Sequence, residues 1–323
     1  MTGGPSRPAI ASLSALLPAL AVVGAAWADP VGGGGMVQRD AVEVSPARGV
    51  RIDVVDVDNR LGDVRVEGHD RDTISIVAVK RAPDADTMER LKVSLVPDPG
   101  GPVTITTALR AGQESRPAPA GSVRIDLVVL APRGARVRAR VWKGRLEVKG
   151  VDNGADLTTD DGDIAVRQVS GAVSTQSGHG HHTLAQIFGA VDARSIDGNL
   201  DLDLVRGDRL DAVVQRGDVT GRRLKIRDLS IRILRGNAVI EGEVVAGGRY
   251  AVASYWGNVE VRFTGRAPLR VLARARSGQV SLPKRFRRRN ERGLVVGYAG
   301  GAGRLPVELD LRTRGGLITL AEF

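Results

Sequence analysis

Three of the four histidines lie close together in the chain and are the side chains best suited to hold a metal ion. In the run Gly178-His179-Gly180-His181-His182, the side chains of His179 and His181 would point to the same side of a strand, about 7 Å apart. If neighbouring segments stack, Asp201 would lie beside His181, and this set of nitrogen and oxygen atoms would suit a borderline divalent metal. An exposed turn with incidental histidines explains the run more simply, so we predict no bound metal and no cofactor.

A second group of side chains suits binding rather than catalysis. Aromatic, aliphatic and arginine residues recur at intervals of about 20 residues, at positions that would face outward if those segments stack. An exposed apolar patch is typical of a surface that binds a glycan, a lipid or another protein. The alternative is that a loop of the same chain covers it. The candidate residues are Trp142, Val213, Leu234, Tyr255, Trp256, Arg232 and Arg274.

The charge of the chain favours an acidic partner. Lys and Arg number 47 against 37 Asp and Glu, which gives a formal net charge of +10. Such a charge attracts polyanions. We predict an acidic glycan, lipopolysaccharide or another envelope protein as the partner, and no nucleic acid; a merely solvated basic face is the alternative. One set of arginines shares a repeat position, at Arg140, Arg194, Arg232, Arg274 and Arg312.

Catalytic motifs are missing from the sequence. A polysaccharide-cleaving enzyme needs two carboxylates at a set separation, and Asp160, Asp161 and Asp163 form one acidic cluster, but Gly-Asp turns explain it adequately. No P-loop, dinucleotide fingerprint or Ser-His-Asp order occurs. The chain has no Cys, which excludes a disulfide framework and a thiol nucleophile. We predict that the protein is not an enzyme.

A repeat must position these side chains, because one glycine pattern recurs through most of the chain. Counting from that glycine, the residue five positions before it is apolar in all ten repeats, and the residues two and four positions after it are aliphatic in most. Such alternation gives each of two strands an inward face, and the glycine permits a tight turn between them. The glycines are Gly62, Gly144, Gly162, Gly178, Gly198, Gly217, Gly236, Gly257, Gly278 and Gly316.

A two-strand unit of about 20 residues cannot bury its inner face alone, so the units must stack. Parallel strands stacked about 4.8 Å apart give every backbone group a partner. The sequence therefore predicts an all-β fold, a parallel β-solenoid (β-helix) of about 20-residue, two-strand rungs with a β-rich N-terminal cap. An antiparallel sandwich is the alternative. A thin aliphatic interior agrees with the low count of aromatics, 3 Trp, 3 Tyr and 4 Phe.

The residue that follows each repeat glycine is polar in nearly every unit. Asn and Asp bond readily to nearby backbone groups in turns, so this column predicts a structural ladder. A calcium site built from Asp63, Asp163 and Asp218 is the alternative. The column reads Asp63, Arg145, Asp163, His179, Asn199, Asp218, Asn237, Asn258 and Gln279.

The chain begins with an apolar run that is typical of a targeting segment. Arg7 precedes it, and Ala26-Trp27-Ala28 fits the small-x-small rule for cleavage. A transmembrane anchor is the alternative, since about 20 apolar residues are just long enough. We predict a signal peptide over residues 1–28 and an exported mature chain without a transmembrane segment, in the periplasm or at the cell surface.

The remaining residues divide into regions by composition and repeat register. Residues 29–48 predict a flexible lead-in, and residues 49–136 a β-rich N-terminal region or cap with a short helix near Asp84–Val93. The solenoid repeats fill residues 137–323, with a basic, Gly-rich insertion at 283–306. The unit around the last glycine would be the last rung of the stack.

The repeat resembles a bacterial family of putative adhesins with β-strand repeats, also called head-GIN-like, a family of unknown function. The units that carry the resemblance begin Thr159-Asp160-Asp161-Gly162-Asp163-Ile164, Ser195-Ile196-Asp197-Gly198-Asn199-Leu200 and Ser254-Tyr255-Trp256-Gly257-Asn258-Val259. The resemblance spans roughly residues 50–323 and implies an exported β-solenoid, without functional residues.

These observations together predict a non-catalytic exported β-solenoid, an adhesin-like binding or scaffolding protein of the bacterial cell envelope. Two alternatives remain open at this point. One is a solenoid carbohydrate-active enzyme that acts on acidic polysaccharide, and the other is a metal-binding envelope protein.

Overall fold

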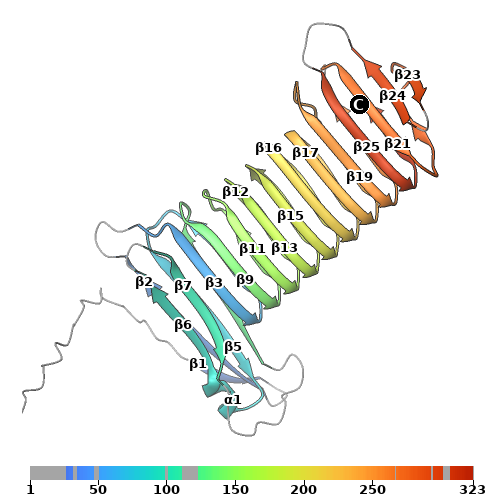
Figure 1. Ribbon diagram of the computed structural model, residues 1–323. Coiled ribbons are helices and arrows are strands. Elements are labelled where there is room, and N and C mark those ends of the chain that lie inside the picture. Colours follow the sequence, from blue (N-terminus) through green and yellow to red (C-terminus); the bar gives the residue numbers. More distant parts are fainter. Residues whose placement is uncertain are drawn as a thin grey trace, which may run out of the picture.

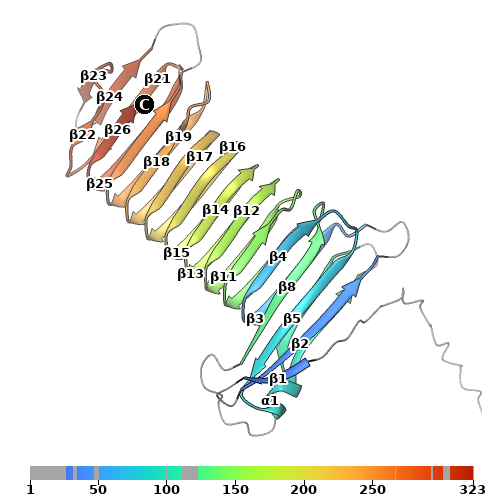
Figure 2. The ribbon, with the colours of Figure 1, turned by 180° about the vertical axis from the view of Figure 1, so that it is seen from behind.

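The computed structural model describes residues 27–31, 35–46, 51–98, 101–110, 123–265, 267–291, 294–300 and 306–322. Within these ranges the chain is almost wholly β-strand, which confirms the all-β class, and it contains one short helix, α1 (Ala85–Arg90). The strands form a long, mostly parallel sheet that does not close and that lies in two facing rows (Figures 1 and 2). The predicted signal segment lies outside the described residues, except that Trp27 and Ala28 begin β1.

The first row faces the viewer in Figure 1. Its strands are parallel from β7 to β21, and antiparallel strands flank them at both ends. In spatial order the row contains β6 (Leu91–Pro97), β7 (Val103–Leu109), β3 (Val54–Leu61), β9 (Arg136–Lys143), β11 (Ala155–Asp161), β13 (Val173–His179), β15 (Val191–Asp197), the second halves of β16 (Leu200–Arg216) and β17 (Val219–Arg235), β19 (Arg249–Trp256), β25 (Val307–Gly315), β21 (Leu269–Ala275), β24 (Leu294–Ala299) and β23 (Arg287–Glu291).

The second row lies behind the first and faces the viewer in Figure 2. Most of its strands continue a first-row strand beyond a tight turn. In spatial order the row contains β1 (Trp27–Val31), β2 (Gly35–Val44), β5 (Ile74–Ala82), β8 (Arg124–Pro132), β4 (Val64–His69), β10 (Leu146–Lys149), β12 (Ile164–Ser170), β14 (His182–Phe188), the first halves of β16 and β17, β18 (Ala238–Glu243), β20 (Val259–Thr264), β26 (Ile318–Glu322) and β22 (Val280–Ser281).

The turns between the two rows require glycine for two reasons. Gly162 has φ +156° and Gly198 has φ +152°, values that L side chains rarely adopt. The backbones of successive turns also touch, so that a Cβ on either glycine would lie 1.9 Å from the carbonyl oxygen of the preceding turn glycine. The repeat glycine is therefore fixed by backbone angle and by stacking at once.

The turn predicted at Gly178 lies two residues further along the chain. In the structure Asp161 pairs with His179, and Gly180 rather than Gly178 occupies the turn, with φ +134°. Counted from Gly180, the inward positions are Thr175 before the turn and His182 after it. The repeat only looks irregular at this point, because Gly178 and Gly180 both fit the spacing of the turn glycines.

Alternate side chains of each strand fill the space between the rows. The interior is mostly Val, Ile, Leu and Ala, as the thin two-row architecture allows. A small polar group interrupts it in the middle of the stack, at Thr159, Thr175, Ser177, His182 and Ser195. All five of these side chains are buried.

At both ends, the spatial order of the strands departs from chain order. At the N-terminal end β7 and β8 lie outside β3 and β4, which pair on their other side with β9 and β10. At the C-terminal end β25 and β26 lie between β19/β20 and β21/β22 (Figure 1). The expectation that the last unit of the chain ends the stack is therefore wrong, because β21 and β22 lie beyond it.

Three further regions differ from the sequence prediction. Residues 35–44, within the expected flexible lead-in, form β2 and pair along their length with β5. The helix is shorter than expected, and its first turn is capped by the Asp84 carboxylate, which accepts the Thr87 N–H at 2.7 Å. The described part of the insertion at 283–306 contains the hairpin β23–β24, which pairs with the edge of β21.

Candidate functional site

A groove of about 530 Å³ opens on the outer face of the first row near the C-terminal end. It crosses five neighbouring strands, from β16 through β17, β19 and β25 to β21. Five of the seven residues predicted as a binding patch line it together: Val213, Leu234, Tyr255, Arg232 and Arg274. Arg276, Arg312 and Arg314 line it as well, and they were not among the patch residues.

Strand register explains why these residues meet. One outward column runs across the strands through paired residues, and its arginines alternate with Val213 and Ala253 before two arginines stand side by side. In spatial order the column reads Arg194, Val213, Arg232, Ala253, Arg312 and Arg274. The predicted arginine column is confirmed, but the exchanged strand order puts Arg312 before Arg274.

The arginines of the groove differ in how they are neutralised. An Nη2 atom of Arg232 lies 3.0 Å from Asp211 Oδ1, and Arg312 pairs with Asp310 on its own strand. Arg274 and Arg276 form no ion pair with any residue that the structure describes. The groove therefore presents more positive charge than its neighbours balance.

Two aromatic rings border the groove. The rings of Tyr255 and Trp256 meet edge to face with centroids 5.4 Å apart, and these side chains are 41% and 47% exposed. The guanidinium carbon of Arg314 lies 4.9 Å from the Tyr255 ring centroid and 5.4 Å from that of Trp256. This contact is a cation–π interaction, which holds the Arg314 side chain against the rings. Trp256 thus belongs to the border of the groove rather than to its lining.

Trp142 does not belong to this group. It lies near the N-terminal end, 49% exposed, where it lines a separate, largely apolar cavity of about 330 Å³ with Leu61 and Leu109. The guanidinium carbon of Arg60 lies 5.7 Å from the Trp142 ring. The prediction that Trp142 shares the patch is wrong, because many rungs separate its strand from β19.

The histidine set expected to suit a metal is not brought together. Thr183, not His181, pairs with Asp201, and the neighbour of His181 is Asn199, whose N–H donates to His181 Nδ1 at 3.1 Å. His179 lies on the adjoining strand end. Among the described residues, no group of three His, Asp or Glu side chains is arranged to hold a metal ion.

His182 is completely buried between the rows and bonded to two hydroxyl groups. Its Nδ1 lies 3.0 Å from Thr175 Oγ1 and its Nε2 lies 2.7 Å from Ser177 Oγ. A neutral imidazole donates from one ring nitrogen and accepts at the other, so both contacts can be hydrogen bonds. Burial lowers the pKa of His182 to about 4. The ring is therefore neutral at pH 7, and its role is structural.

The polar column after the turn glycines forms a ladder as predicted, except that His181 rather than His179 follows the turn glycine and takes part in it. The side chain of one turn accepts the backbone N–H of the next, as Asp163 Oδ1 does from His181 at 2.9 Å and Asp218 Oδ1 from Asn237 at 2.7 Å. Asp63 Oδ1 likewise accepts from Arg145, which separates it from Asp163. The alternative calcium site is not assembled, because its three carboxylates lie on different turns and each accepts from the backbone.

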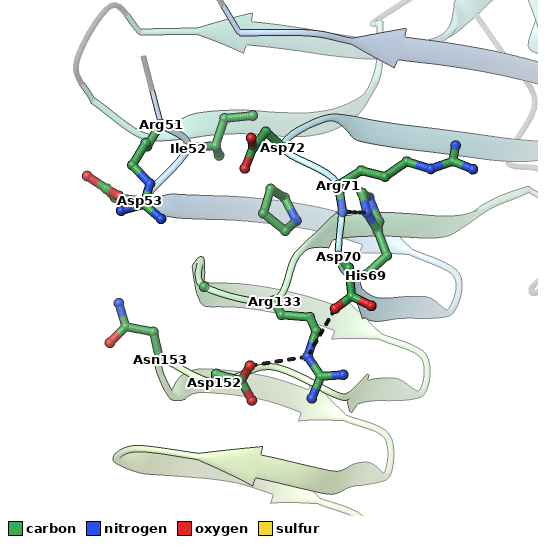
Figure 3. A pocket seen from close by; sticks show the side chains of 12 residues that line it. Arg51, Ile52, Asp53, His69, Asp70, Arg71, Asp72, Arg133, Asp152 and Asn153 are labelled. Atoms are coloured by element: carbon green, nitrogen blue, oxygen red, sulfur yellow. Dashed lines mark hydrogen bonds and ion pairs between the residues drawn. The ribbon is translucent and has the colours of Figure 1, made fainter. Parts of the chain in front are cut away.

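A second cavity, of about 460 Å³, lies at the ends of β4, β8 and β10 (Figure 3). Figure 3 shows that charged side chains gather there. Arg133 Nε lies 3.1 Å from Asp152 Oδ2 and 3.8 Å from Asp70 Oδ1, and His69 Nδ1 accepts the Arg71 N–H at 2.9 Å. The sequence offered no signal for this cluster, because it depends on the pairing of β4 with β8 across an intervening segment.

Comparisons with known proteins are limited to distant solved structures. No protein family matches the chain, and no curated protein is similar to it in sequence. A putative cell adhesion protein from Clostridium sporogenes ATCC 15579 is 10% identical, with a TM-score of 0.24, over 89% of this chain and 100% of that one. A putative adhesin from Bacteroides fragilis NCTC 9343 is 14% identical, with a TM-score of 0.39, over 87% and 96%. One from Parabacteroides distasonis ATCC 8503 is 12% identical, with a TM-score of 0.27, over 87% and 96%. The head-GIN-like family stays a prediction from the sequence.

Proposed function

We propose that this chain is an exported, non-catalytic β-solenoid that binds a partner at the bacterial cell envelope in the manner of an adhesin. The observation that carries the proposal is the groove across β16 to β21, because it combines guanidinium groups with exposed apolar and aromatic surface. Charged and aromatic side chains on a repetitive, rigid face are suited to binding an extended partner.

The fold and the location rest on separate observations. Parallel pairing of β9, β11, β13 and β15, with a glycine turn after each, supports a solenoid of two-strand rungs. The apolar run that ends at Ala26-Trp27-Ala28 supports export. In the described part of the chain, no helix is both long and apolar enough to cross a membrane.

The chemistry of the groove supports binding rather than turnover. Apart from Tyr255, its ionisable side chains are arginines, which keep their charge throughout the ordinary pH range and act as donors only. General acid–base catalysis uses groups that gain and lose protons near the working pH. We therefore propose that the groove holds its partner without changing it.

Binding to an array of envelope polysaccharides and lipopolysaccharides tests the proposal. We expect the purified chain to retain at least one acidic ligand, and the double variant Arg274→Gln/Arg314→Gln to lose about tenfold in affinity, since two charge-assisted contacts disappear. Arg194→Gln is the matched control, because Arg194 lies in the same column, paired with Asp192 outside the groove.

Two results would contradict the proposal. Unchanged binding by the double variant would remove the groove from the binding site, and new chain ends released from a bound polysaccharide would show turnover. Export is tested separately, by cell fractionation of the full chain and of a chain without residues 1–28. We expect only the shortened chain to stay in the cytoplasm.

A further inference from the structure

The geometry of the groove points to one class of ligand. We propose that it binds a linear polysaccharide with a carboxylate on each sugar, laid along the stack so that neighbouring carboxylates meet the arginines of β25 and β21. This inference rests on the proposed function and specifies its ligand.

Four arginines of the groove lie at regular, neighbouring positions. Arg312 and Arg274 occupy paired positions on the neighbouring strands β25 and β21, and Arg314 and Arg276 follow two positions later along the same two chain segments. Neighbouring strands lie about 4.8 Å apart, and positions i and i+2 of one strand about 7 Å apart. The four side chains thus form a block of two by two cations.

The positive charge of this block is largely unbalanced by neighbouring carboxylates. Like charges at neighbouring positions repel one another, and only Arg312 has a carboxylate partner, Asp310, among the described residues. Arg314 rests on the Tyr255 and Trp256 rings instead. The block therefore favours a ligand that brings several negative charges at short, regular intervals.

The shape of the guanidinium group suits a carboxylate ligand. A guanidinium presents a planar fork of donors that matches the two oxygens of a carboxylate. A pyranose ring advances a linear polysaccharide by a distance comparable with the strand spacing of about 4.8 Å. A polyuronate that lies across the strands would therefore present carboxylates at an interval that matches the neighbouring arginines of β25 and β21.

The groove also has an apolar part beside the arginine block. Val213, Leu234 and Tyr255 continue it from the arginine block toward β16. Leu234 and Tyr255 are only half-covered. Such an open, half-exposed apolar surface fits the apolar face of sugar rings, whereas the acyl chains of a lipid would need a cavity that buries them.

Oligogalacturonides of two to eight sugars provide the test, with calorimetry as the measurement. We expect affinity to rise with length until the oligomer spans the five strands from β16 to β21 and then to level off. The methyl-esterified oligomer of equal length, which lacks the charges, should bind about tenfold more weakly. Arg274→Gln/Arg276→Gln should lose a similar factor and flatten the dependence on salt, while Arg194→Gln should match the unchanged chain.

The outcomes separate this inference from the proposed function. Affinity that is independent of length, or equal for the ester, overturns the polyuronate. The same holds if anionic phospholipid vesicles bind through the groove and oligogalacturonides do not. In that case the loss of vesicle binding in Arg274→Gln/Arg314→Gln would still support a binding groove, whereas groove variants that alter binding of no acidic ligand would overturn both.

Discussion

The middle rungs and the C-terminal end depart from the repeat in opposite ways. From β11 to β16 the strands stack in chain order, and the unusual residues point inward, where His182 and its hydroxyl partners replace aliphatic side chains. From β19 to β26 the strand order is exchanged, and the unusual residues point outward, where arginines and aromatic rings form a groove.

Both regions obey the same constraints of the repeat. Glycine turns and alternating burial fix the backbone in both regions, so either face can vary as long as the stacking is kept. Variation inside affects stability and its dependence on pH, because buried polar groups need partners. Variation outside affects recognition.

Removal of residues 306–323 should have the largest effect. It deletes β25 and β26, which separate β19/β20 from β21/β22, and it exposes the neighbouring inner faces. At about 2 kcal/mol for each lost apolar side chain, the free energy of unfolding should fall by about 10 kcal/mol, which is comparable with the whole stability of many proteins. The deleted buried side chains are Val307, Leu309, Leu311, Ile318 and Leu320.

Urea unfolding measures this loss, followed by circular dichroism and by the fluorescence of Trp256 in a chain whose other two tryptophans are Phe. Arg312→Gln, an outward change on β25, is the matched control and should leave the midpoint nearly unchanged. A truncated chain with an unaltered midpoint would show that the exchanged end is a peripheral addition rather than part of one cooperative stack.

Acidification should weaken the middle rungs through His182. Its pKa lies near 4 in the folded chain, below the ordinary 6.5, mainly because of burial, with Asp163 opposing and His181 adding to that shift. Between these values the unfolded chain binds the proton and the folded chain does not, so stability falls as pH falls. The loss at pH 5 should be about 2 kcal/mol and below pH 4 about 3 kcal/mol.

His182→Leu separates this contribution from that of the carboxylates. The variant removes the imidazole contacts of the Thr175 and Ser177 hydroxyls, which lowers stability about equally at every pH. The slope between pH 7 and pH 5 should decrease by the amount due to His182. His69→Gln is the control, because His69 lies in the charged cavity near the N-terminal end. An unchanged slope in His182→Leu would mean that the buried ring is not the group that titrates.

Two neighbouring threonines should respond with opposite signs. Thr159 Oγ1 is buried and has no hydrogen-bond partner among the residues that the structure describes, so Thr159→Val should raise the free energy of unfolding by about 1 kcal/mol. Thr175→Val removes the hydroxyl that contacts His182 Nδ1 and should lower it by a similar amount. Thermal melts of both variants measure the difference, and a stabilising Thr175→Val would contradict the hydrogen-bonded arrangement around His182.

Much of the backbone could be predicted from the sequence, because the glycine spacing and the alternation of apolar residues reflect the stacking directly. The region at residues 49–136 is predicted to be rich in β-strands, and it contains the strands from β3 to β8. The turn at Gly180 was misplaced, because Gly178 fits the same spacing and a buried histidine hides the aliphatic pattern. A pattern of residue types cannot separate two glycines that lie two positions apart.

The groove was predictable only in part. Val213, Leu234 and Tyr255 share outward columns that equal offsets from the glycine already indicated. The contact of Arg314 with the aromatic rings was not predictable, because it depends on β25 lying next to β19. The period of a repeat does not determine the order of its strands in space. The charged cavity at Arg133 was missed for the same physical reason.

The exchanged order of the C-terminal strands has a consequence for resistance to proteases. In a stack that follows chain order, the last rung has one neighbour and can fray strand by strand. Here β25 and β26 have hydrogen-bonded neighbours on both sides, while β21, β22 and the β23–β24 hairpin take the outer position. Amide exchange should therefore be slower in β25 than in β22. A carboxypeptidase should stop at the part of β26 that pairs with both β20 and β22.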